Sequence, residues 1–153
     1  MPLRRPKRVD GFPYRGPYQY LLTFCTAGRR RLFGNIEVVT SIVEQFERTA
    51  RDEHFTVLAY CVMPDHVHLV VEGSAPGSDL RRFVKMAKQR SAYRLWKDHR
   101  LQGVWQEGFH DWVIRSDQAI ADVIRYVLDN PVRAGLAERW DSYPFSRTAY
   151  PLS

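Results

Sequence analysis

A small set of polar side chains has the types and spacing that metal-assisted phosphoryl transfer requires. His66 and His68 lie two residues apart in an apolar run, and Tyr126 precedes Asn130 by four residues. Alternate side chains of a strand share a face, so both imidazoles would project together and could clamp a divalent metal ion. A phenol can attack phosphorus, and an amide oxygen suits a hard cation. These residues predict a metal centre with a nearby nucleophile.

Each of these residues also has an ordinary structural interpretation. An arbitrary His-x-His is more often a pair of exposed or hydrogen-bonded strand histidines. Tyrosine is common at half-buried helix positions, and Asn130 before Pro131 is a natural N-cap for a short helix. From the residues alone, Asn130 is therefore open to two roles, metal ligand and helix cap.

A predicted β-hairpin positions the histidines. Residues 55–63 and 66–72 are rich in β-branched and apolar residues, and only Pro64 and Asp65 separate them. The histidines would begin the second strand, with their neighbours turned to the opposite face of the sheet.

A predicted helix positions the tyrosine. Ser116 can cap it, and Pro131 ends it because proline lacks an amide donor and disfavours helical geometry at the residue before it. At 100° per residue, Tyr126 lies off the apolar stripe, with Asn130 one turn later. That stripe consists of Ile120, Ile124 and Val127.

The remaining segments complete the order β, α, β, β, α, β, α. Residues 18–26 and 111–115 are predicted strands, Asn35 caps an amphipathic helix, and Asp79 opens a basic helix with a core stripe. This order predicts an α+β, ferredoxin-like (RRM-like) fold. It is an antiparallel sheet with helices on one face and an additional C-terminal helix that carries the tyrosine.

The length of 153 residues fits one domain. Residues 1–17 mix basic residues with prolines and glycines, which predicts a flexible basic arm. The folded domain is expected over 18–143, and 144–153 are expected to form a tail. Cys25 and Cys61 lie in apolar strand-like segments, which is typical of inert buried thiols.

A net charge of +6 and a pI near 9.6 favour a nucleic-acid partner. No apolar run is long enough for a membrane span, and the start of the chain has no secretory pattern, so we expect a cytoplasmic protein that joins the nucleoid when it acts. The residues expected to contact DNA are Arg4, Arg5, Lys7, Arg8, Arg29, Arg30, Arg31, Lys85, Lys88, Arg90 and Arg133.

Three blocks resemble those of the REP-associated tyrosine transposases, relatives of the single-tyrosine insertion-sequence transposases in the His-hydrophobic-His (HUH) class. They keep the order and spacing of that family. The blocks are YCVMPDHVHLV at 60–70, WQEGFHD at 105–111 and YVLDNPVRAGL at 126–136.

The resemblance implies a ferredoxin-like transposase domain that cleaves and rejoins single-stranded DNA carrying a foldback hairpin or palindromic repeat. Carried over by motif, His66 and His68 hold Mg²⁺ or Mn²⁺, Asn130 is a third ligand, and Tyr126 forms a 5′-phosphotyrosine intermediate. His110 lies in the second block and so is expected near the site, as a structural residue or a DNA contact. No nucleotide cofactor is expected, because the sequence has no Gly-rich phosphate loop.

Two other functions are also compatible with the sequence. A ferredoxin-like sheet can serve as a non-catalytic module for single-stranded nucleic acid, although no RNP-like strand is present. A metal phosphodiesterase could instead use water, which would form no covalent adduct. The sequence is compatible with a monomer and with a homodimer.

Overall fold

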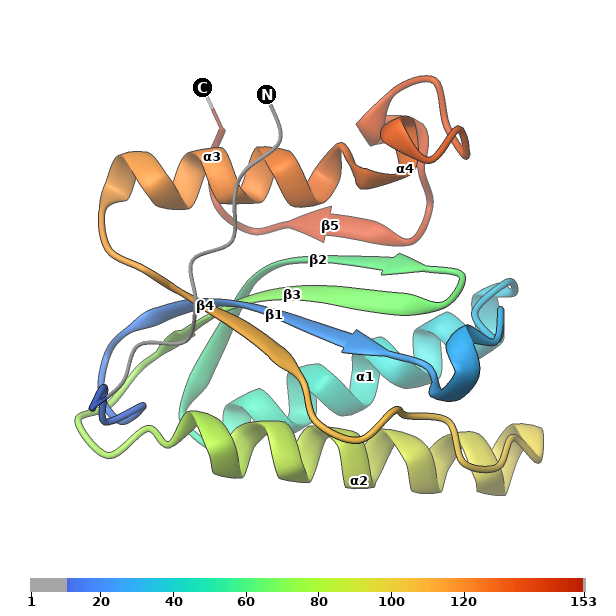
Figure 1. Ribbon diagram of the computed structural model, residues 1–153, viewed down its shortest axis with the longest axis horizontal. Helices are drawn as coiled ribbons and strands as arrows, with labels where there is room; N and C mark the ends of the chain where they lie inside the picture. Colours follow the sequence, from blue (N-terminus) through green and yellow to red (C-terminus); the bar gives the residue numbers. More distant parts are fainter. Residues whose placement is uncertain (1–10, 153) are drawn as a thin grey trace.

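The computed structural model describes residues 11–152 of the chain and is built on a five-stranded sheet in the order β4-β1-β3-β2-β5 (Figure 1). Every neighbouring pair of strands is antiparallel. The strands are β1 (Gln19–Cys25), β2 (Phe55–Met63), β3 (His66–Gly73), β4 (His110–Ile114) and β5 (Ser146–Thr148).

Helices cover both faces of this sheet (Figure 1). The elements are η1 (Ala27–Arg29), α1 (Ile36–Asp52), α2 (Leu80–His99), α3 (Asp117–Leu128), α4 (Asn130–Arg133) and η2 (Trp140–Ser142). The predicted α+β antiparallel fold is confirmed, with α1 and α2 on one face and the tyrosine-bearing α3 on the other. Within residues 11–152, no helix combines the length and apolar character that crossing a bilayer demands.

Side-chain alternation along the strands builds two separate cores. Val67, Leu69 and Val71 of β3 pack in the cluster that includes α1 and α2. Val70 packs instead with Ile120 and Ile124 of α3. The histidines of β3 therefore face α3, because they alternate with Val67 and Leu69.

Local signals placed the helices correctly. Asn35 Oδ1 accepts a hydrogen bond from the Val38 amide at 2.9 Å, and Ser116 Oγ accepts one from Ala119 at 3.1 Å. Asp79 caps α2. The core stripe predicted for α2 is buried and consists of Leu80, Val84, Ala87, Ser91 and Leu95.

Only residues 11–17 of the expected basic arm are described by the structure, and they differ from the expectation. Arg4, Arg5, Lys7 and Arg8 lie outside the described residues. Residues 11–17, by contrast, are packed: Tyr14 is only 4% exposed, and the Gly16 amide donates to the Ser78 carbonyl at 2.9 Å. The prediction of a flexible segment was wrong here because the rings of Phe12 and Tyr14 pack against each other and against Tyr20.

The expected tail also contains structure. Its residues 146–148 form β5, which pairs with β2 at the edge of the sheet. Just before it, the Tyr143 hydroxyl donates to the Val62 carbonyl at 2.6 Å. A strand of three residues is too short for an alternation pattern, so only its partner strand reveals it.

Gly73 lies against the backbone of the packed N-terminal segment and gives a test of that packing. A methyl group there would overlap the Gly16 carbonyl oxygen and lie 3.0 Å from the Ser78 side chain. Gly73→Ala is therefore expected to lower the free energy of unfolding by about 3 kcal/mol, measured by urea denaturation. Gly34→Ala is the control, since its methyl group meets nothing within 4 Å. Equal stability of the two variants would contradict the packing of residues 14–18 onto the sheet.

Candidate active site

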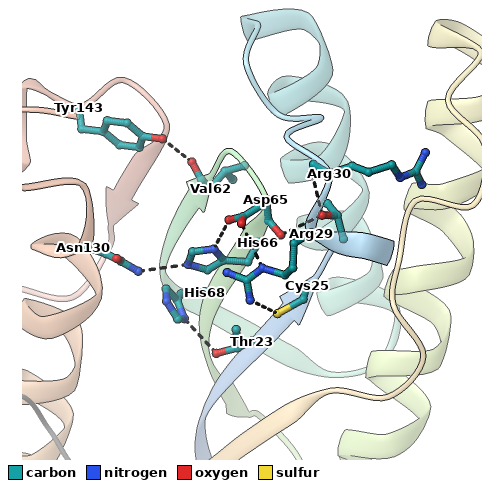
Figure 2. Close-up of polar contacts among 11 residues, drawn as sticks. Thr23, Cys25, Arg29, Arg30, Val62, Asp65, His66, His68, Asn130 and Tyr143 are labelled. Atoms are coloured by element: carbon teal, nitrogen blue, oxygen red, sulfur yellow. Dashed lines mark hydrogen bonds and ion pairs between the residues drawn. The ribbon is translucent and has the colours of Figure 1, made fainter. Parts of the chain in front are cut away.

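His66 and His68 lie side by side at the start of β3, as predicted (Figure 2). Their ring centroids are 4.9 Å apart and their planes are nearly perpendicular at 81°. His68 is 4% exposed, and the His66 side chain is 15% exposed. The pair thus sits in a largely desolvated place, where its interactions are stronger than on an open surface.

A hydrogen bond at Nδ1 holds each of the two imidazole rings in its orientation. His66 Nδ1 donates to Asp65 Oδ1 at 2.7 Å, and His68 Nδ1 shares a hydrogen bond of 3.0 Å with Thr23 Oγ1 (Figure 2). Such partners fix the ring orientation and, for a carboxylate, raise the basicity of the other nitrogen. Sequence reasoning missed both residues. Asp65 could have been found from its place directly before the histidines, whereas Thr23 depends on the pairing of β1 with β3.

Arg29 completes the surroundings of Asp65. Its Nε donates to Asp65 Oδ2 at 3.0 Å, and its Nη1 lies 3.3 Å from Cys25 Sγ. Burial alone would raise the pKa of Asp65, but the hydrogen bonds from His66 and Arg29 outweigh it and hold the pKa below its ordinary value. Asp65 therefore stays a carboxylate that can orient His66. Arg29, which is predicted to contact DNA, therefore lies beside the histidines.

Asn130 reaches the same place from the end of α3. Its Nδ2 donates to His66 Nε2 at 3.4 Å (Figure 2). Asp129 has helical dihedral angles, so the chain passes almost without interruption from α3 into α4. No side chain caps α4. Of its two predicted roles, the Asn130 side chain therefore does not take the capping one in this structure.

Tyr126 is half-buried and lies one helical turn before Asn130. The Arg133 guanidinium carbon lies 4.1 Å from its ring centroid, and Arg133 Nη2 donates to the Tyr126 carbonyl at 2.8 Å. This is cation–π geometry combined with a backbone hydrogen bond, which restrains the ring. Arg133, expected as a DNA contact, thus contacts the candidate nucleophile.

His110 lies in the same row of the sheet as His68. Thr23 of β1 is in register with His68 on one side and with His110 of β4 on the other. Two strand spacings, roughly 10 Å, separate the backbones of the two histidines, with Thr23 between them. Within residues 11–152 there is no group of three or more His, Cys, Asp and Glu residues suited to a metal ion.

The basic residues of α2 lie on the other face of the sheet from the histidines. Lys85, Lys88 and Arg90 belong to a helix that covers the opposite face of the sheet (Figure 1). Lys88 Nζ donates to the Gln106 and Gly108 carbonyls at 2.7 and 2.6 Å, and burial lowers its pKa. Arg90 Nη1 pairs with Asp52 at 2.7 Å. The contacts of Lys88 and Arg90 are structural, and Lys85 is exposed.

Arg30 and Cys61 also have structural surroundings, whereas Cys25 is only half-buried. The Arg30 guanidinium donates to backbone carbonyls of Ala27, Gln102 and Gly103, which ties η1 to the loop after α2. Arg31 is exposed. Burial raises the pKa of the Cys61 thiol to about 12, which fits the expected inert role.

An antiparallel sheet that presents a His-x-His pair toward a tyrosine-bearing helix defines the class of the single-tyrosine transposases. The chain belongs to the family described as "Transposase IS200 like", whose pattern matches residues 16–130. The predicted resemblance to REP-associated tyrosine transposases is confirmed by the relatives below.

Two curated relatives carry that family name. A candidate REP-associated tyrosine transposase of Haemophilus influenzae is 27% identical over 113 residues, covering 66% of this chain and 63% of the relative. The REP-associated tyrosine transposase of Escherichia coli is 26% identical over 112 residues, covering 69% of this chain and 66% of the relative. The matched region thus spans slightly less than two thirds of the length of either relative.

A solved structure of a REP-associated tyrosine transposase bound to a REP hairpin shares the fold. It superposes with a TM-score of 0.76 and 20% sequence identity, over 92% of this chain and 82% of that one. At this identity the likeness establishes the architecture alone.

The contacts of Lys88 can be tested against those of Lys85, one turn earlier on the same helix. Lys88→Met removes both hydrogen bonds to the loop, so we expect faster amide hydrogen exchange over 106–110 and a loss of about 1–2 kcal/mol in the free energy of unfolding. Lys85→Met changes the charge equally and should alter neither quantity. Unchanged exchange in Lys88→Met would refute its structural role.

Proposed function

We propose that this protein cleaves and rejoins single-stranded DNA by transferring a phosphate to Tyr126, with a divalent metal ion held by His66, His68 and Asn130. The observation that carries the proposal is the contact of Asn130 with His66, two residues separated by 64 positions. It supports a single centre formed by β3 and the helix that bears the tyrosine.

The donor set fits Mn²⁺ better than Mg²⁺. An amide oxygen suits both of these hard cations, whereas two imidazoles are better accepted by the softer transition-metal ion. A half-turn of the Asn130 amide would exchange Nδ2 for Oδ1, which would bring an oxygen donor beside His66 Nε2, where Nδ2 lies at 3.4 Å. When bound, the ion would supply Lewis-acid stabilisation of the charge that builds on the phosphate oxygens.

The chain itself would supply the nucleophile and its orientation. The Tyr126 oxygen attacks phosphorus and the bond to the 3′-oxygen breaks, which gives a 5′-phosphotyrosine and a free 3′-hydroxyl. The phenol loses one proton and the 3′-oxygen gains one, so the step is balanced without ATP. Arg133 holds the tyrosine ring and adds positive charge beside the developing phenolate. Attack by a 3′-hydroxyl reverses the step and rejoins the strands.

A DNA hairpin is the proposed substrate. The names of the relatives and the REP hairpin in the solved structure support it, as does the net charge of +6. Arg29 is the predicted DNA contact placed beside the histidines. It would meet the phosphate backbone there, while Arg31 and Lys85 offer more distant contacts.

A covalent adduct is the direct test. With Mn²⁺ and single-stranded DNA from around its own gene that contains a palindrome, the wild type should give a protein–DNA band that survives denaturation. Tyr126→Phe should give none, because phenylalanine lacks the attacking oxygen. Tyr93→Phe, on the exposed side of α2, is the matched control and should behave as wild type.

Two different results of the adduct experiment would indicate the two alternative functions. Cleavage without an adduct that persists in Tyr126→Phe would indicate a phosphodiesterase that uses water. Binding without cleavage, across several palindromes and both metals, would indicate a non-catalytic module.

Asp65 gives a separate test of the metal centre. Removing a carboxylate that orients a histidine ligand commonly weakens metal binding about 10- to 100-fold, so Asp65→Ala should lower Mn²⁺ affinity by that factor in titration calorimetry. Asp98→Ala removes an exposed carboxylate on α2 and should not change the affinity. Equal Mn²⁺ affinity in wild type and Asp65→Ala would place the ion elsewhere.

A further inference from the structure

A pocket of about 200 Å³ lies directly beside the histidines. Thr23 and Cys25 of β1 form one part of its lining, and residues 106–110 form the rest. Thr23 hydrogen-bonds to His68, and Cys25 is in register with His66. A DNA strand whose phosphate lies at the histidines would therefore have a neighbouring nucleotide within reach of this pocket.

The loop that forms the outer wall is held in place by its backbone. The Gln106 amide donates to the Cys25 carbonyl at 2.9 Å. Lys88 of α2 donates to the Gln106 and Gly108 carbonyls. At the start of the loop, Trp105 Nε1 donates to Ser91 Oγ at 3.0 Å. These contacts fix the backbone without using the side chains of Gln106 and Glu107.

Those two side chains are available for a ligand. Gln106 and Glu107 are exposed, and within residues 11–152 neither side chain makes a hydrogen bond. Phe109 adds apolar surface to the same pocket. A wall that is partly apolar with a polar rim matches a nucleobase, which has an apolar face and a hydrogen-bonding edge.

Charges of opposite sign lie at two sides of the pocket. Arg29 Nη1 lies 3.3 Å from Cys25 Sγ, on the side of the histidines, where it suits a phosphate, and Glu107 brings a carboxylate to the lining formed by the loop. A carboxylate repels a phosphate but accepts hydrogen bonds from an exocyclic amino group, as of cytosine. Thymine is disfavoured, because its one ring N–H lies between two carbonyl oxygens that repel a carboxylate.

We propose that this pocket binds one unpaired nucleobase next to the cleaved phosphate, and that Glu107 selects bases with an exocyclic amino group over thymine. The inference rests on the proposed function for its biological meaning. The selection itself is a property of binding, so it can be measured without cleavage.

The test compares fluorescently labelled oligodeoxycytidine with oligodeoxythymidine, two pyrimidines of similar size, by anisotropy at neutral pH and moderate salt. The wild type should bind the cytidine oligomer about tenfold more tightly. Glu107→Ala should bring the two affinities within about twofold, and Gln106→Ala should reduce the ratio less, since the carboxylate remains. The test uses the ratio of the affinities for the two oligomers, because the loss of a negative charge raises both affinities.

Glu44→Ala provides the control for charge. Glu44 is exposed on α1, on the other side of the sheet, and its loss should leave the wild-type ratio unchanged. A cytidine preference that is equal in wild type and Glu107→Ala, with both proteins folded by thermal melting, would overturn the inference. So would the absence of a preference in the wild type. Neither result bears on the Tyr126 adduct, which decides the proposed function separately.

Discussion

The pairing register of β1 with β3 is the constraint on which the candidate site depends. It sets Thr23 opposite His68 and Cys25 opposite His66, while the alternating residues of both strands fill the core under α1 and α2. A slip of one residue would turn the histidines into that apolar core and turn Val67 and Leu69 toward α3. The burial of the core therefore also determines the placement of the imidazoles.

A chain of polar contacts then connects elements that are distant in sequence. Arg29 of η1 binds Asp65, Asp65 binds His66, and His66 meets Asn130 at the start of α4. Each link satisfies a polar group that would be costly to leave unpaired in a partly buried place. This arrangement explains how one strand and one helix from opposite halves of the chain present their functional groups in the same space.

The positive charge of the protein has more than one role. Lys88 and Arg90 stabilise the fold by binding loop carbonyls and Asp52, whereas Arg29 and Arg133 contact the residues of the candidate site. A net charge favours nucleic acid in general, but it does not identify which cations meet the strand. Membership of the IS200-like transposase family gives this division its functional context.

Local rules were sufficient for much of this protein. The caps at Asn35 and Ser116, the stripe of α2, the hairpin and the shared face of His66 and His68 all follow from periodicities that act within a few residues. The tertiary structure alone decided the packing of Tyr14, the strand β5, the support of His68 by Thr23 and the contact of Asn130 with His66. These features depend on strand order, register and the face that α3 covers, which arise from contacts between distant segments and leave no repeating pattern in the sequence.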